Sequence, residues 1–117
     1  MRPTVVIVDD HAEFRASATA VLEAGGFEVV GAAADAADGM EMTGRLKPHI
    51  VLLDVQLRDG NGFDVAEALA RRPEAPLVVL VSSRDASAYR RRLATASARG
   101  FIAKRDLTGA ALAALVA

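Results

Sequence analysis

The sequence predicts an α/β fold in which a five-stranded parallel sheet carries helices on both faces. Two observations support this prediction. Short apolar runs recur along the 117 residues, and a segment with apolar residues at helical spacing follows each run. Because strand and helix alternate strictly, the strands should be parallel and joined by right-handed crossovers. The predicted strands are residues 5–8, 27–33, 50–53, 77–81 and 100–103.

Each helix is predicted by apolar residues on one face and, in three cases, by a residue that ends it. Gly25 and Gly26 end the first helix, Pro48 follows the second and Pro73 follows the third. Glycine favours the C-terminal cap of a helix, and proline cannot continue one. The positions that share a face are Phe14, Ala18, Val21 and Leu22 in the first helix, Ala36, Met40 and Thr43 in the second, Phe63, Ala66 and Ala70 in the third, and Thr108, Ala111, Leu112 and Leu115 in the last.

The composition indicates one soluble domain and excludes several functions. A chain of 117 residues can bury one core but is too short for two ordinary domains. The formal net charge of -1, from 14 basic and 15 acidic residues, gives no reason to expect direct nucleic-acid binding. The absence of cysteine excludes disulfide and thiolate chemistry, and no apolar stretch approaches the roughly 20 residues that span a bilayer. The expected location is the cytoplasm.

Carboxylates directly follow two of the apolar runs. Asp9 and Asp10 follow the first strand, and Asp54 follows the third. In a sheet of order 2-1-3-4-5 these two strands are neighbours, and their carboxyl ends border the crevice where ligands bind. Carboxylates held so close raise one another's pKa unless a cation neutralises them, and oxygen ligands favour Mg²⁺. A single acid would be better explained as a helix cap, whereas the three together favour a metal site.

Two further polar residues occupy equivalent strand ends. Ser82 follows the fourth strand, and Lys104 follows the fifth. Singly, Ser82 would be explained as a turn or helix cap and Lys104 as a solvated charge. Jointly with the acids they supply a carboxylate nucleophile, a divalent cation site, a hydroxyl donor and a fixed positive charge. Phosphoryl transfer requires these groups, because its catalysis consists mainly of positioning and charge stabilisation.

Four motifs of the chain, in this order and spacing, resemble those of the receiver domains of two-component response regulators. The resemblance covers essentially the whole length and is greatest to the receiver half of regulators that carry a LuxR-type helix-turn-helix. It implies the flavodoxin-like (βα)5 fold with strand order 2-1-3-4-5, and a single receiver domain over residues 1–117 with no output domain in this chain. The motifs are Val8-Asp9-Asp10-His11, Leu53-Asp54-Val-Gln-Leu-Arg-Asp-Gly-Asn-Gly62, Val81-Ser82-Ser83 and Gly100-Phe-Ile-Ala-Lys104.

The resemblance implies a role for each residue of the site. Asp54 would be the phosphoacceptor, with Mg²⁺ as the cofactor. Phe101 matches an aromatic position that turns inward when the hydroxyl residue moves toward the phosphate, although plain core packing explains it equally well. The other implied roles are direct metal ligation by Asp10, ligation through water by Asp9, ligation by the backbone carbonyl of Gln56, and phosphate binding by Ser82, by the backbone N–H of Ser83 and by Lys104.

The resemblance also implies partners. A sensor histidine kinase or a phosphotransfer protein would donate its phosphoryl group to Asp54, so that the domain is a signalling switch rather than a turnover enzyme. The output would pass to a downstream domain or protein through the fourth helix, fifth strand and fifth helix. Arg90, Arg91 and Arg92 lie in the predicted fourth helix and would suit an acidic partner, although a solvated face is the simpler explanation. Pairing of two copies through this face stays open.

Two alternative functions are also compatible with the residues. Arg58 and Arg105 replace prolines common in the family, which motivates a receiver that docks a partner without being phosphorylated and leaves open whether the Lys104–Arg105 peptide is cis. A phosphohydrolase of the haloacid-dehalogenase type also uses an aspartate nucleophile and Mg²⁺. That class carries Asp-x-Asp after its first strand, whereas Asp9 and Asp10 are adjacent here.

Overall fold

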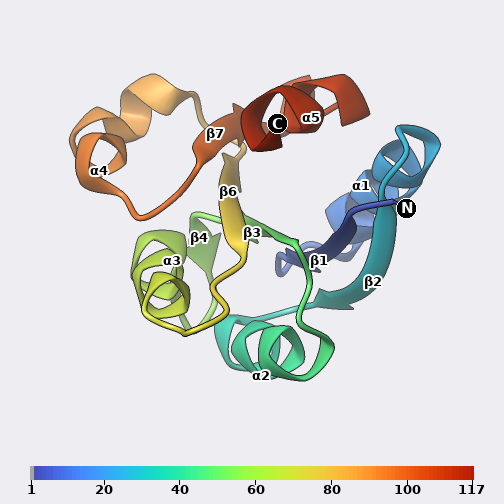
Figure 1. Ribbon diagram of the computed structural model, residues 1–117. Coiled ribbons are helices and arrows are strands. Elements are labelled where there is room, and N and C mark those ends of the chain that lie inside the picture. The colour runs from blue at the N-terminus through green and yellow to red at the C-terminus, as the bar shows by residue number, and fades with distance from the viewer. Residues whose placement is uncertain (1) are drawn as a thin grey trace.

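Five parallel strands form the central sheet of the computed structural model, which describes residues 2–117 (Figure 1). Their order is β2-β1-β3-β6-β7. Because β4 and β5 form a separate small sheet, β6 and β7 are the fourth and fifth strands of the central sheet, and its order is the predicted 2-1-3-4-5. The predicted fold class and strand order are therefore confirmed. The strands are β1 (Thr4–Val8), β2 (Glu28–Ala33), β3 (Ile50–Asp54), β6 (Leu77–Ser82) and β7 (Gly100–Ala103).

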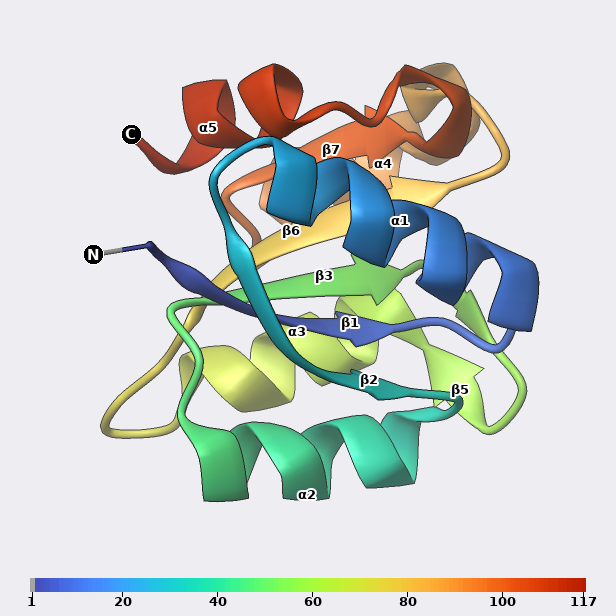
Figure 2. The ribbon, with the colours of Figure 1, turned by 90° about the vertical axis from the view of Figure 1, so that its right-hand side faces the viewer.

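Helices cover both faces of this sheet, as predicted. Helices α1 and α5 lie on one face and α2 and α3 on the other, while the carboxyl ends of the strands point away from the two chain termini (Figure 2). The helices are α1 (Ala12–Ala24), α2 (Ala36–Leu46), α3 (Gly62–Ala70), α4 (Arg90–Thr95) and α5 (Gly109–Val116).

The core divides into two layers because side chains alternate along each strand. Val5 and Ile7 of β1 pack beneath α1 and α5 with Leu22 and Leu112, whereas Val6 and Val8 pack on the opposite face. All four of these β1 residues are completely buried. A strand covered on both faces needs apolar residues at every position, which explains the continuous apolar runs of the sequence.

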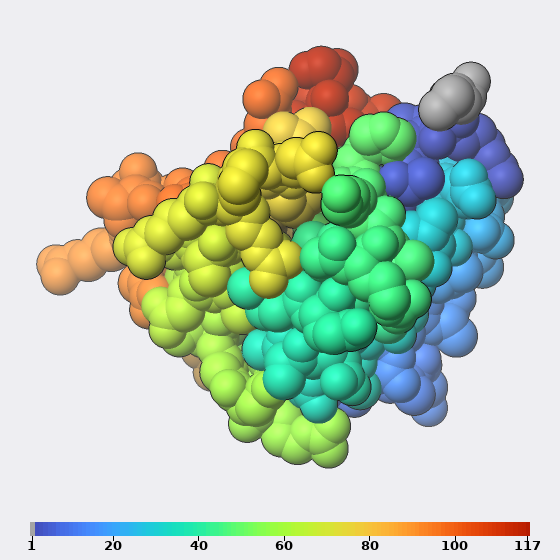
Figure 3. Space-filling view, turned by 60° about the horizontal axis from the view of Figure 1, so that its bottom comes forward, coloured from blue at the N-terminus to red at the C-terminus, as the bar shows by residue number. Residues whose placement is uncertain are grey.

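Two local features differ from the simple alternation of strand and helix. A short antiparallel hairpin of β4 (Gln56–Leu57) and β5 (Gly60–Asn61) lies between β3 and α3. The predicted fourth helix consists of a 3₁₀ turn, η1 (Ala86–Tyr89), followed by the six-residue α4, and neither contains a fully buried residue. The α4 segment therefore lies at the margin of the molecule, and it projects at the left of the surface in Figure 3.

No peptide bond between residues 2 and 117 is cis, so the Lys104–Arg105 bond is trans. Within the same residues, no helix has the length and apolar character needed to cross a membrane.

Candidate functional site

The carboxylates at the ends of β1 and β3 come together as the sequence predicted. Val8 pairs with Leu53 in the parallel register, so the residues that follow them leave the sheet side by side. Ligand atoms of Asp9, Asp10, His11 and Asp54 all lie within 4.8 Å of one another. Asp9 is 0% exposed and Asp54 is 3% exposed, so two acids of this cluster are withdrawn from solvent.

Lys104 reaches this cluster from η2 (Lys104–Asp106), the 3₁₀ turn directly after β7, and β7 lies two strands away from β3 in the sheet. Its Nζ atom is 2.6 Å from Asp9 Oδ2 and 3.3 Å from Asp54 Oδ2. The ammonium also lies 4.5 Å from the centre of the Phe14 ring, which adds a cation–π contact. The side chain of Lys104 is only 13% exposed, so its charge is directed at the acids rather than at water.

The protonation of Asp54 reflects this crowded environment. Burial and the neighbouring charge of Asp9 raise the pKa of Asp54 to about 6, against the opposing effects of Lys104 and of the Gln56 N–H. One lysine therefore does not fully offset the cost of holding these acids together out of water. A further cation would lower this cost.

The donor atoms of the cluster fit a hard divalent cation. Asp9 Oδ2 and Asp10 Oδ1 are buried and have no hydrogen-bond partner within residues 2–117, although Lys104 forms an ion pair with the first of them. Carboxylate oxygens are the ligands that Mg²⁺ prefers. His11 Nδ1 lies 3.1 Å from Asp9 Oδ1 and 3.1 Å from Asp10 Oδ1, but the side chain of His11 is 68% exposed, at the outer margin of the cluster.

The β4–β5 hairpin holds the chain next to Asp54. The backbone N–H of Gln56 donates to Asp54 Oδ1 at 3.3 Å, and Gln56 pairs with Asn61 across the hairpin. At the end of the hairpin Gly62 passes so close that a Cβ atom there would lie 2.4 Å from the Asp54 carbonyl oxygen. The backbone carbonyl of Gln56 thus belongs to a segment packed tightly against Asp54.

The tip of this hairpin is attached to helix α2. The Asp59 carboxylate accepts hydrogen bonds from the backbone N–H groups of Ala36 and Ala37, at 2.8 and 3.1 Å. These two bonds hold the pKa of Asp59 below its ordinary value. Asp59 thus ties the segment after Asp54 to the first turn of α2. No sequence motif points to Asp59, because a capping carboxylate from another part of the chain leaves no local pattern.

Ser82 lies at the end of β6 and is 2% exposed. Its Oγ atom accepts the Arg84 N–H at 3.1 Å and lies 2.9 Å from the hydroxyl oxygen of Tyr89. The neighbouring Ser83 is exposed. Tyr89 belongs to none of the sequence motifs, and the one signal for it in the sequence is that it is the only tyrosine in the chain.

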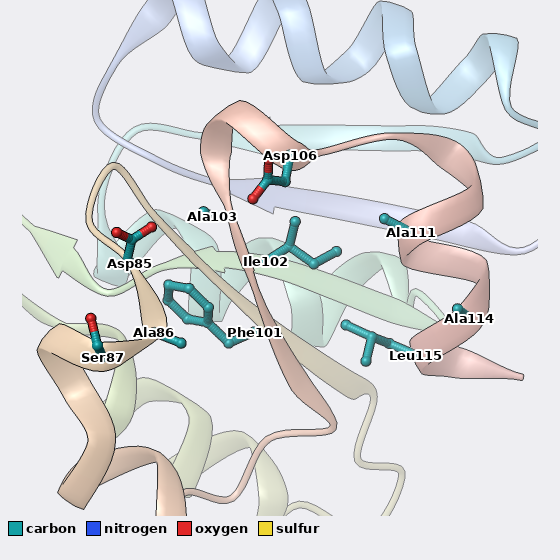
Figure 4. Close-up of a pocket in the computed structure, with 10 residues that line it drawn as sticks. All are labelled: Asp85, Ala86, Ser87, Phe101, Ile102, Ala103, Asp106, Ala111, Ala114 and Leu115. Carbon is teal, nitrogen blue, oxygen red and sulfur yellow. The ribbon is translucent and has the colours of Figure 1, made fainter.

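Phe101 connects this region to a cavity on the surface. Its ring lies 6.0 Å from that of Tyr89, centre to centre, and Tyr89 lies 5.8 Å from Phe63. Phe101 also lines a cavity of about 600 Å³ between η1, β7 and α5, where Ala86 and Leu115 lie among the other lining residues (Figure 4). Phe101 is half-buried, so both core packing and a switch role remain compatible with its position.

Comparison with known proteins identifies the class to which this fold and site belong. The family model of the response regulator receiver domain matches residues 5–116, and the chain belongs to that family. It is a response regulator receiver domain, and such domains are signalling domains rather than turnover enzymes. This membership confirms the resemblance seen in the sequence and sets aside the phosphohydrolase alternative.

Individual relatives support this assignment. The DNA-binding transcriptional activator EvgA of Escherichia coli K12 is 29% identical over 112 residues, which cover 96% of this chain and 55% of EvgA. The transcriptional regulatory protein PdtaR of Mycobacterium tuberculosis is 36% identical over 83 residues, covering 69% of this chain and 40% of PdtaR. The chain thus spans about half the length of the curated relatives it matches.

A solved structure agrees with these relatives. The signal receiver domain of the putative response regulator NarL from Mycobacterium tuberculosis superimposes with a TM-score of 0.85 and is 29% identical in sequence. The match covers 97% of this chain and 96% of that domain. The fold seen here is therefore that of a receiver domain along nearly its whole length.

Proposed function

We propose that Asp54 accepts a phosphoryl group from the phosphohistidine of a sensor histidine kinase or phosphotransfer protein. The observation that carries this proposal is the cluster of Asp9, Asp10 and Asp54, in which Lys104 bridges two buried acids. Two buried carboxylate oxygens of this cluster lack hydrogen-bond partners among residues 2–117. Phosphorylation then alters the face formed by α4, β7 and α5, through which the domain acts on a downstream domain or protein.

The carboxylate of Asp54 is the nucleophile. A pKa of about 6 leaves most Asp54 side chains ionised at neutral pH. One Asp54 oxygen attacks phosphorus in line, and the P–N bond of the phosphohistidine breaks as the imidazole departs with the bonding electron pair. The product is an acyl phosphate on Asp54, and the charge that it brings is about -1.5 to -2.

Other residues of the site neutralise and orient this group. Lys104 turns its ammonium from the carboxylates toward a phosphoryl oxygen, while the Ser82 hydroxyl and the backbone N–H of Ser83 donate hydrogen bonds to other oxygens. Asp10, Asp9 through a water molecule, and the Gln56 carbonyl would hold Mg²⁺. When bound, this ion supplies the positive charge that stabilises the transferring phosphoryl oxygens.

The first experiment measures phosphorylation directly. The protein is incubated with Mg²⁺ and acetyl phosphate, and its intact mass is compared with those of Asp54→Asn and of Asp106→Asn, which changes an exposed aspartate of η2. We expect one phosphoryl adduct on the wild type and on Asp106→Asn and none on Asp54→Asn. An adduct that persists on Asp54→Asn would exclude Asp54 as the acceptor. Absence of an adduct from a folded wild type, even with a donor kinase, would favour a receiver that acts by docking alone.

A further inference from the structure

The hydroxyl of Tyr89 is placed to control Ser82. We propose that Tyr89 is a positioning residue, which holds the Ser82 hydroxyl in the unphosphorylated domain and releases it when Ser82 turns to the phosphoryl group. This inference rests on the proposed function, because Ser82 is taken there as a phosphate ligand. It adds a residue that the motifs of the sequence do not contain.

The contacts of Ser82 leave its hydroxyl little freedom. The Oγ atom accepts the Arg84 N–H at 3.1 Å and lies 2.9 Å from Tyr89 Oη, and the residue is 2% exposed. Water therefore has little access to compete for these bonds. Rotation of Ser82 toward a phosphoryl oxygen must break or reorient the bond to Tyr89, so the unphosphorylated arrangement is stabilised by one hydrogen bond between side chains.

Tyr89 is itself held by its ring. It lies between Phe63 of α3 and Phe101 of β7, with centre-to-centre distances of 5.8 and 6.0 Å and tilted planes. Neither η1 nor α4 contains a fully buried residue, so the half-buried Tyr89 is one of few anchors for this segment, together with half-buried Leu93. Loss of the bond to Ser82 should therefore loosen η1 and α4 together.

Release of Tyr89 would also change the surface that we expect to contact partners. Ala86, which begins η1, faces the ring of Phe101 across one side of the cavity shown in Figure 4. Tyr89 ends the same 3₁₀ turn and packs on the same ring. A shift of η1 would therefore reshape the wall of this cavity. In this way the position of the Ser82 side chain would influence the surface formed by η1, β7 and α5.

The hydrogen bond can be tested first in the unphosphorylated protein. Tyr89→Phe keeps the ring and removes only the oxygen, and Ser82→Ala removes the other partner. We expect Tyr89→Phe to raise amide hydrogen exchange in residues 84–95 about fivefold, the factor expected from one ordinary net hydrogen bond. Ser82→Ala should raise it at least as much, because it also removes the acceptor of the Arg84 N–H. The double variant should show no increase beyond that of Ser82→Ala, because the Ser82–Tyr89 bond is already lost there. Thr19→Val, which removes a hydroxyl bonded within α1, should leave these residues unchanged.

The release on phosphorylation is then tested with acetyl phosphate and Mg²⁺. At limiting acetyl phosphate, Tyr89→Phe should form the Asp54 adduct several times more readily than the wild type. Phosphorylation should also change the amide hydrogen exchange of residues 84–95 less in Tyr89→Phe than in the wild type. Additive effects of Tyr89→Phe and Ser82→Ala, or equal phosphorylation of Tyr89→Phe and wild type, would overturn the proposal. Absence of an adduct from the wild type, both with acetyl phosphate and with a donor kinase, would instead overturn the proposed function and with it the release step. Non-additivity would still establish the Ser82–Tyr89 bond.

Discussion

Lys104 lies closer to Asp9 than to Asp54: its Nζ atom is 2.6 Å from Asp9 Oδ2 and 3.3 Å from Asp54 Oδ2. Asp9 is completely buried, so in the absence of a metal ion this lysine is its main source of compensating charge. The lysine expected to bind the phosphoryl group thus also maintains the acid cluster before phosphorylation. Removing it should affect stability as well as phosphorylation.

Replacement of Lys104 by methionine tests this double role. The change keeps much of the side-chain volume but leaves buried Asp9 and Asp54 without a cation. We expect the free energy of unfolding to fall by about 3 kcal/mol at neutral pH, since removing one partner of a buried pair leaves an uncompensated charge. Urea unfolding in EDTA measures this loss, and Mg²⁺ should restore part of it.

The other lysine of the chain provides a matched control. Lys47 forms an ion pair with Glu74 in which both side chains are largely exposed. Lys47→Met should therefore change the free energy of unfolding by less than about 1 kcal/mol. Equal losses from the two lysine variants would contradict the special position of Lys104.

The raised pKa of Asp54 predicts how stability depends on pH. Its pKa is about 6 in the folded domain and has an ordinary value of 3.8, so the folded state retains a proton that the unfolded chain loses between these values. Without metal, stability should therefore fall as the pH rises from about 4 to about 6. Asp54→Asn cannot ionise and should be more stable than the wild type by about 2 kcal/mol at neutral pH.

Urea unfolding in EDTA across this pH range measures the effect. The difference between Asp54→Asn and the wild type should disappear below about pH 4, where the carboxyl is protonated in both states. A difference that stays constant with pH would show that it does not arise from ionisation of Asp54.

Close packing of Gly62 against Asp54 gives a steric prediction. A Cβ atom at Gly62 would meet the Asp54 carbonyl oxygen at 2.4 Å, and that oxygen belongs to the backbone, which has little room to move. We expect Gly62→Ala to lower the free energy of unfolding by about 2 kcal/mol and to slow phosphorylation by displacing Asp54. Gly60→Ala is the control, because a Cβ atom there meets nothing within 4 Å. Similar behaviour of the two variants would exclude the steric explanation.

The attachment of the hairpin to α2 predicts an effect on the proposed metal site. Asp59→Ala removes the acceptor for Ala36 N–H and Ala37 N–H and should let the Gln56 segment move. We expect Mg²⁺ binding to weaken about tenfold, the lower end of the loss usual for residues that support metal ligands. Mg²⁺ titrations followed by amide chemical shifts measure this affinity.

Asp35 offers the matched control at the same helix end. It caps α2 by accepting the Asp38 N–H, but it does not belong to the hairpin. Asp35→Ala should therefore weaken α2 and leave Mg²⁺ affinity close to that of the wild type. Equal losses of affinity would mean that α2 stability, rather than the hairpin, supports the site.

Much of this fold could be predicted because its signals are local. A strand covered on both faces must be apolar throughout, so β1 and β3 were recognisable from short runs. The residues that end these strands meet at one sheet edge, which is why the positions of Asp9 and Asp54 in the chain were enough to place them together. Family motifs then supplied the expected roles of Ser82 and Lys104.

Only the tertiary structure decided how these groups are held. The bond between Ser82 and Tyr89, the attachment of Asp59 to α2, and the preference of Lys104 for Asp9 all depend on the distance between separate segments, where a change of a few tenths of an ångström decides whether a bond forms. The pKa of Asp54 likewise depends on how completely water is excluded around it. Spacing along a chain determines which residues approach one another, whereas packing in three dimensions determines which atoms bond and how strongly their charges interact.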